Sequence, residues 1–167
     1  MGRTVKLYVM KPQHVSGKPG VLLFIHGGVW IVGNFQNHQR LLRDLVVGSG
    51  QIGVFVEYTP LPSAKFPVQL EECYAALKWV SEHAGDIGAD GSRIAVAGNS
   101  VGGNMTAALA LIMAKDRKGP KISYQVLLIP ATERRYGVLP QLWNGPLSHA
   151  GVHEIRLGPL RARREDA

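Results

Sequence analysis

The chain has a single cysteine, Cys73, among its 167 residues, so no disulfide can form within it. Aromatic residues make up only 7% of the sequence, and no apolar stretch is long enough to cross a membrane as a helix. The N-terminus also lacks the charged and then apolar segments of a secretory signal. These absences favour a cytoplasmic protein without a disulfide framework.

The charge is basic but not concentrated in any segment. Lys and Arg number 19 against 12 Asp and Glu, which gives a net charge of +7. The basic residues are scattered along the chain. They do not form the basic stripes interleaved with aromatic residues that many nucleic-acid-binding surfaces have. We therefore expect no nucleic-acid partner. A hydrophobic content of 46% in 167 residues is enough for one domain with a core.

Apolar runs alternate with helical patterns over residues 1–132. Strand-like runs cover Thr4–Met10, Val21–Ile25, Ile52–Glu57, Arg93–Ala97 and Tyr124–Ile129, and helical patterns cover Asn37–Val47, Val68–Ala84 and Gly102–Lys115. The central runs are apolar throughout, which is typical of strands covered on both faces. This alternation predicts an α/β domain whose mostly parallel sheet has about five strands and is flanked by helices.

The most informative segment is Gly98-Asn99-Ser100-Val101-Gly102, between the last-but-one strand and the helix that follows it. A G-x-S-x-G sequence at a strand-to-helix turn is typical of a serine nucleophile held in strained backbone with its hydroxyl exposed. The N-terminus of the next helix favours negative charge at the same place. The alternative is that this segment is only the glycine-rich start of a helix and has no catalytic role.

A glycine pair, Gly27-Gly28, follows the strand Val21–Ile25 and His26. Glycines leave backbone N–H groups accessible, as an oxyanion hole requires, and the N–H of Val101 would complete such a hole. We expect His26 to shape this loop rather than to act as a base. An ordinary turn is the alternative for the glycine pair.

Three motifs resemble, in order, those of hormone-sensitive-lipase-like esterases, which are α/β-hydrolases. The matching segments are His26-Gly27-Gly28-Val29 (H-G-G-G in the family), Tyr58–Pro67 (Y-R-L-A-P-x-x-x-F-P) and Gly98–Asn104 (G-D-S-A-G-G-N). The second segment matches at Tyr58, Pro62, Phe66 and Pro67. In the other two motifs, Val29, Asn99 and Val101 depart from the family pattern. The resemblance covers roughly Thr4 to Thr132.

The resemblance implies a serine carboxylesterase that hydrolyses short-chain acyl esters through an acyl-enzyme on Ser100. It also implies that Gly27, Gly28 and Val101 donate to the oxyanion. The expected partner is thus a small-molecule ester. We find no cofactor-binding signature, and we assign no metal ligand.

The resemblance ends near Thr132, before the acid and the histidine of the family's triad. Residues 133–167 contain His149, His153 and Asp166, but in the wrong order and without the family's surrounding motifs. We therefore assign no acid or base and expect weak activity. The alternative is a non-catalytic hydrolase fragment that acts as an interaction or small-ligand-binding module.

We interpret residues 133–167 as a divergent, poorly ordered tail, for which a shifted reading frame is one hypothesis. The spacing of His149 and His153 is most simply a coincidence, and Glu71-Glu72 is most simply a solvated helix face.

The family's cap helices have no counterpart before Thr4, so we expect no cap domain. The run Tyr124–Ile129 would be an internal strand in the parent fold, whereas here its outer edge would be unpaired. Because exposed apolar strand edges pair with other chains, we expect self-association through this edge.

Overall fold

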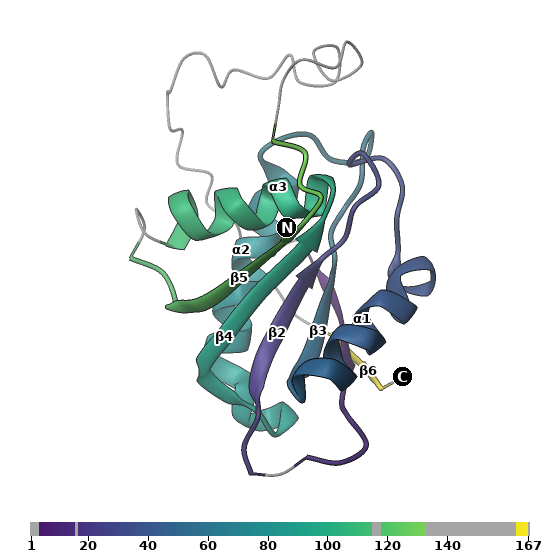
Figure 1. Cartoon of the computed structure of the whole chain (residues 1–167). Coiled ribbons are helices and arrows are strands. Elements are labelled where there is room, and N and C mark those ends of the chain that lie inside the picture. Colours follow the sequence, from purple (N-terminus) through teal and green to yellow (C-terminus); the bar gives the residue numbers. More distant parts are fainter. Residues whose placement is uncertain (1–3, 16, 115–117, 133–162, 167) are drawn as a thin grey trace.

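A computed structural model describes residues 4–15, 17–114, 118–132 and 163–166 (Figure 1). Its elements, in chain order, are β1 (Lys6–Met10), β2 (Gly20–Ile25), α1 (Phe35–Ser49), β3 (Ile52–Glu57), α2 (Val68–His83), the 3₁₀ helix η1 (Ala84–Ile87), β4 (Asp90–Asn99), α3 (Val101–Ala108), the π-helical turn η2 (Leu109–Ala114), β5 (Ile122–Leu128) and β6 (Arg163–Asp166).

The strands form a sheet in the order β5-β4-β2-β3-β1-β6. Strands β5, β4, β2 and β3 run parallel to one another, and β1 is antiparallel to β3. The predicted α/β class with a mostly parallel sheet is therefore confirmed. The strand count differs, because β6 pairs with the outer side of β1 and makes the described sheet six-stranded.

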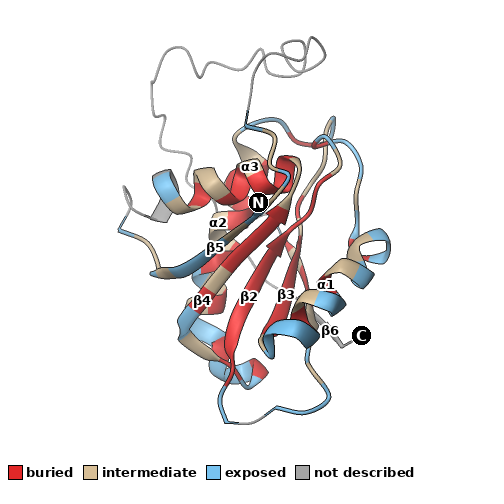
Figure 2. Cartoon of the chain, in the orientation of Figure 1, coloured by how far each residue is buried: buried red, intermediate tan, exposed pale blue. Residues whose placement is uncertain are grey.

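The helices cover the sheet from two sides (Figure 1). Helix α1 packs over β3 and β1 on one face, and α2 and α3 pack on the other face, over β2, β4 and β5. Strand β2 lies in the middle and is buried along its whole length, as Figure 2 shows. Its neighbouring side chains Leu23 and Phe24 belong to the two separate cores on opposite faces.

Helix α1 is longer than the predicted Asn37–Val47 because polar residues and a glycine define its ends. Asn34 and Asn37 form a reciprocal capping box, with N-to-Oδ1 distances of 3.0 and 3.1 Å. The helix ends at Gly50, whose φ of +66° is the left-handed conformation common after helices.

Helix α2 carries the single cysteine into the core. The side chain of Cys73 is fully buried, and burial raises the pKa of its thiol well above the usual value. This position agrees with the small core residue that the helical pattern indicates.

Strand β6 was not predicted, because residues 133–167 show no steady hydrophobic period. It joins the sheet through backbone pairing of Lys6 with Arg163 and of Val9 with Asp166. Residues 133–162, which include His149 and His153, lie outside the described residues. The domain boundary after Thr132 therefore stays a prediction.

Strand β5 is the last described strand on its side of the sheet, and no other described strand pairs with its outer edge. Large apolar side chains are exposed on and next to it, with Tyr124 exposed by 72% and Ile129 by 85%. The observed strand, Ile122–Leu128, contains no charged residue. The described helices include none that is both long and apolar enough to cross a membrane.

Candidate functional site

Ser100 occupies the turn between β4 and α3, where its backbone has φ 52° and ψ −120°. This conformation is strained for a residue with a Cβ and costs about 1–3 kcal/mol. Serine at a helix N-cap commonly accepts a hydrogen bond from the first turn, but the Ser100 side chain does not. The hydroxyl of this half-buried residue is therefore not engaged in capping the helix.

Three backbone hydrogen bonds hold Ser100 in this conformation. Its N–H donates to Leu128 O at 3.0 Å, and its carbonyl accepts from Asn104 N at 3.1 Å and from Ala131 N at 3.0 Å. Both Leu128 and Ala131 lie at the end of β5 or just beyond it. The last described strand thus fixes the turn that carries the candidate nucleophile.

Two glycines flank Ser100 because backbone from other elements passes too close for a side chain. A Cβ on Gly102 would lie 2.1 Å from Ile25 O, and one on Gly98 would lie 2.4 Å from Gly102 O. Helix α3 therefore begins directly against the end of β2. This contact brings Ser100 next to the loop that contains Gly27 and Gly28.

The loop after β2 has unusual backbone at three consecutive residues: Gly28, Val29 and Trp30 have φ values of +118°, +55° and +58°. The carbonyl of Gly28 accepts from Ile31 N at 3.0 Å and from Val32 N at 2.9 Å. In a trans peptide the N–H points opposite to the carbonyl, so these bonds also fix the direction of the Val29 N–H.

His26 anchors the start of the same loop. Its Nδ1 donates to Gly27 O at 2.7 Å, which fixes the direction of the Gly28 N–H by the same geometry. Its ring stacks on Tyr58 with centroids 4.0 Å apart, and the Tyr58 hydroxyl donates to His26 O at 3.1 Å. The ring is fully buried, and Nε2 has no partner among the described residues. Its position agrees with the prediction that His26 shapes the loop.

Gly27 does not fit the prediction that its amide serves the oxyanion. The N–H of Gly27 donates to Asn99 Oδ1 at 2.9 Å, so in this arrangement it is not available to a ligand. By contrast, the amides of Gly28, Val29 and Val101 have no acceptor among the described residues. The engagement of the Gly27 amide could not be predicted from the sequence, because its acceptor lies 72 residues away along the chain.

The start of the segment Tyr58–Pro67 is held by the carboxylate of Glu72. Glu72 is buried, with 1% exposure, and accepts from Thr59 N at 2.7 Å and from Thr59 Oγ1 at 2.9 Å. The interpretation of Glu72 as part of a solvated face is thus wrong.

The described ranges place no imidazole or carboxylate in hydrogen-bond contact with the Ser100 side chain. His38 contacts Asn37 Oδ1 at 2.6 Å, and His83 stacks on Trp79 and contacts its carbonyl at 3.0 Å. Groups of His, Cys, Asp and Glu suited to a metal ion are also not found among the residues described. The expectation that acid and base are missing therefore stays a prediction for the rest of the chain.

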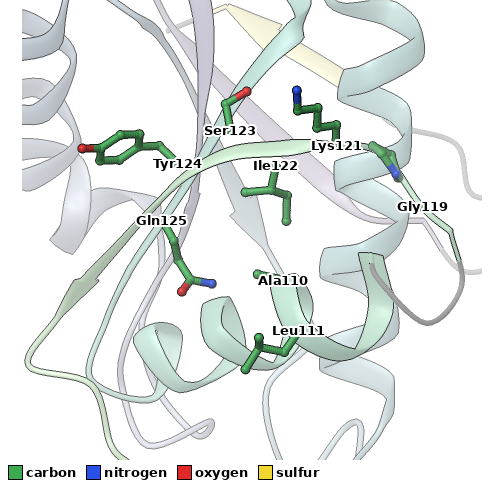
Figure 3. Close-up of a pocket in the computed structure, with 9 residues that line it drawn as sticks. Ala110, Leu111, Gly119, Lys121, Ile122, Ser123, Tyr124 and Gln125 are labelled. Carbon is green, nitrogen blue, oxygen red and sulfur yellow. The ribbon is translucent and has the colours of Figure 1, made fainter.

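An open cavity of about 400 Å³ lies between η2 and β5, away from Ser100. Figure 3 shows Ile122 and Gln125 directed toward Ala110 and Leu111, whereas Lys121 and Ser123 point to the other side of the strand. Because Ser100 does not line it, we do not assign this cavity to acyl binding.

Residues 22–144 match the family described as alpha/beta hydrolase fold, and the chain belongs to this family. It is 38% identical over 128 residues to carboxylesterase NlhH of Mycobacterium tuberculosis, covering 77% of this chain and 40% of that protein. It is also 33% identical over 101 residues to hormone-sensitive lipase of Ictidomys tridecemlineatus, covering 60% of this chain and 13% of that protein.

Among solved structures, a thermostable esterase from Pseudomonas putida is similar to this chain with a TM-score of 0.73 and 49% identity, covering 80% of this chain and 42% of the other. The predicted resemblance to hormone-sensitive-lipase-like esterases is therefore confirmed. The chain spans about two-fifths of the length of the carboxylesterase and of the Pseudomonas esterase.

We predict that Gly102→Ala destabilises the protein by about 1–3 kcal/mol or more, because the added methyl group meets backbone and cannot be accommodated by a rotamer change. Gly48→Ala is the matched control, since a Cβ at Gly48 in α1 meets nothing within 4 Å. Urea unfolding of both variants checks this. Equal midpoints would show that α3 does not approach β2 as closely as described.

A second prediction concerns pH. Burial, aided by the nearby His38, lowers the pKa of His26 from 6.5 to about 4, against the opposing hydrogen bond to Gly27. Between these values the unfolded chain binds the proton more readily, so this contribution to stability is complete above pH 6.5 and is lost as the pH falls toward 4.

The loss attributable to His26 is up to about 3 kcal/mol. In His26→Gln the slope of unfolding free energy against pH should become shallower between pH 4 and 6.5, because that side chain no longer takes up a proton on unfolding. An unchanged slope in this variant would contradict a neutral, buried His26.

Proposed function

We propose that this chain is the nucleophile-bearing part of a serine carboxylesterase that acts on short-chain acyl esters. The observation that carries the proposal is the strained backbone of Ser100, whose hydroxyl does not cap α3 and which lies beside an anchored glycine loop. The relatives named carboxylesterase and esterase support this class of reaction.

In the proposed reaction Ser100 Oγ attacks the ester carbonyl and forms a tetrahedral intermediate. The amides of Gly28 and Val101 donate to its oxyanion, and we add Val29 in the place that the prediction gave to Gly27. Collapse of the intermediate expels the alcohol, and water then hydrolyses the acyl-serine. The Ser100 proton passes to solvent, since no described side chain is placed to accept it.

Turnover without a positioned acid and base should be weak. Enzymes that lack triad members retain roughly 10³–10⁴-fold catalysis over water through the oxyanion hole and substrate binding. The alternative, a non-catalytic hydrolase fragment that binds a partner or a small ligand, uses the same fold without this chemistry. The cytoplasmic location and the lack of a nucleic-acid partner stay predictions.

We predict that the protein hydrolyses 4-nitrophenyl acetate about tenfold or more faster than Ser100→Ala, because the variant lacks the proposed nucleophile. Ser92→Ala, which removes an exposed hydroxyl, should keep the wild-type rate. Release of 4-nitrophenolate is the measurement, and intact mass after treatment with a fluorophosphonate locates the adduct. Equal rates for wild type and Ser100→Ala would favour the non-catalytic alternative.

We also propose that β5 pairs with β5 of a second copy. The strand is uncharged, so two copies meet without repulsion between strands despite the net charge of +7. Within Ile122–Leu128 the strand has none of the charged residues or prolines that usually protect sheet edges; Pro120, Lys121 and Pro130 lie beyond its ends.

Light scattering over a range of concentrations should therefore show dimers. Tyr124→Lys should weaken them, because it places like charges at the interface, whereas Val47→Lys on the exposed side of α1 should not. A wild-type protein that stays monomeric at all concentrations would refute the proposal.

A further inference from the structure

The Asn99 side chain joins the nucleophile turn to the loop after β2. It is half-buried, and its Oδ1 accepts the Gly27 N–H at 2.9 Å. A Cβ on Gly27 would lie 2.8 Å from both Asn99 Nδ2 and Asn99 O, so the loop packs directly on this residue. The residue that precedes Ser100 is therefore in contact with the residue that precedes Gly28.

The other hydrogen bonds of the loop after β2 that involve His26, Gly27 and Gly28 do not reach the turn of Ser100. The Tyr58 hydroxyl binds His26 O, His26 Nδ1 binds Gly27 O, and the carbonyl of Gly28 binds residues 31 and 32. These bonds fix the internal shape of the loop and attach it to the end of β3. The bond from Gly27 to Asn99 instead joins the loop directly to the residue before Ser100.

The chemistry of an amide suits this place. A carboxylate, which the motif of hormone-sensitive-lipase-like esterases has at this position, would also accept the Gly27 N–H, and it would add a negative charge near the site where an oxyanion forms. The Asn99 amide accepts the bond while remaining neutral. Leucine branches at the same carbon but lacks an acceptor, so Asn99→Leu removes the bond while it keeps the branched shape of the side chain.

We propose that Asn99 is a positioning residue that holds the amides of Gly28 and Val29 in register with Ser100. This inference rests on the proposed function, because the register matters only if Ser100 reacts. Asn99 itself touches no reacting atom in this scheme. It acts through the peptide of Gly27. Its loss should slow the reaction of Ser100 with the reagent without weakening the binding of the reagent that precedes the reaction.

The test is the phosphonylation of Ser100 by an alkyl fluorophosphonate, followed by intact mass spectrometry of the protein. This reaction needs the nucleophile and the oxyanion donors but no turnover. In Asn99→Leu we expect the limiting rate of labelling to fall about 10–100-fold, as expected when oxyanion donors lose their alignment, with the half-saturating reagent concentration changed less than about twofold. Asn99→Asp, which restores an acceptor, should recover the rate to within about fivefold of wild type.

Gln69→Met is the matched control. Gln69 is buried, and its Nε2 donates to Ala64 O at 2.9 Å, so this variant also removes one buried amide hydrogen bond but leaves the loop at Gly27 intact. It should label at the wild-type rate. Thermal unfolding of all variants shows whether each is folded at the assay temperature.

The outcomes separate the two proposals. If Asn99→Leu labels at the wild-type rate while Ser100→Ala does not label, Asn99 does not position the loop and the role of Ser100 stands. A loss in Asn99→Leu that Asn99→Asp does not recover, or that Gln69→Met shares, also overturns the positioning role. If wild type labels no faster than Ser100→Ala, the nucleophile itself is refuted and the inference fails with it.

Discussion

The close approach of α3 to the end of β2 is the constraint on which the rest of the site depends. The helix begins so near to Ile25 O and His26 O that only glycine fits at position 102. This contact turns the chain sharply at Ser100 and places the turn against the loop of Gly27 and Gly28. A helix held a few ångströms further away would keep the turn and the loop intact but would separate them from each other.

Both halves of the site are fixed by many small interactions rather than by one strong one. Ser100 is held by backbone bonds to Leu128, Asn104 and Ala131, so its strained conformation depends on β5 as well as on β4. The loop is held by a buried ring and by its own carbonyls. Backbone donors fixed in this way need no reorganisation when charge develops, which is the physical basis of oxyanion stabilisation.

The sequence predicted the elements better than their mutual contacts. Strands β2 and β3 follow from continuous apolar runs, and the turn at Ser100 follows from glycines between a strand and a helix. The ends of α1 depend on Asn34 and Gly50, which lie outside its apolar pattern. The bond between Gly27 and Asn99 and the burial of Glu72 opposite Thr59 could not be predicted, because each depends on how distant segments meet. Strand β6 was missed because residues 163–166 have no hydrophobic period in the sequence.

The position of Cys73 has a practical consequence. Its thiol is completely buried in α2, against the core that supports β2 and β4, and burial keeps it protonated at neutral pH. Only the thiolate reacts readily with alkylating reagents. The rate at which such a reagent modifies the folded protein therefore measures how often this layer opens to solvent, so the native chain contains its own reporter of core dynamics.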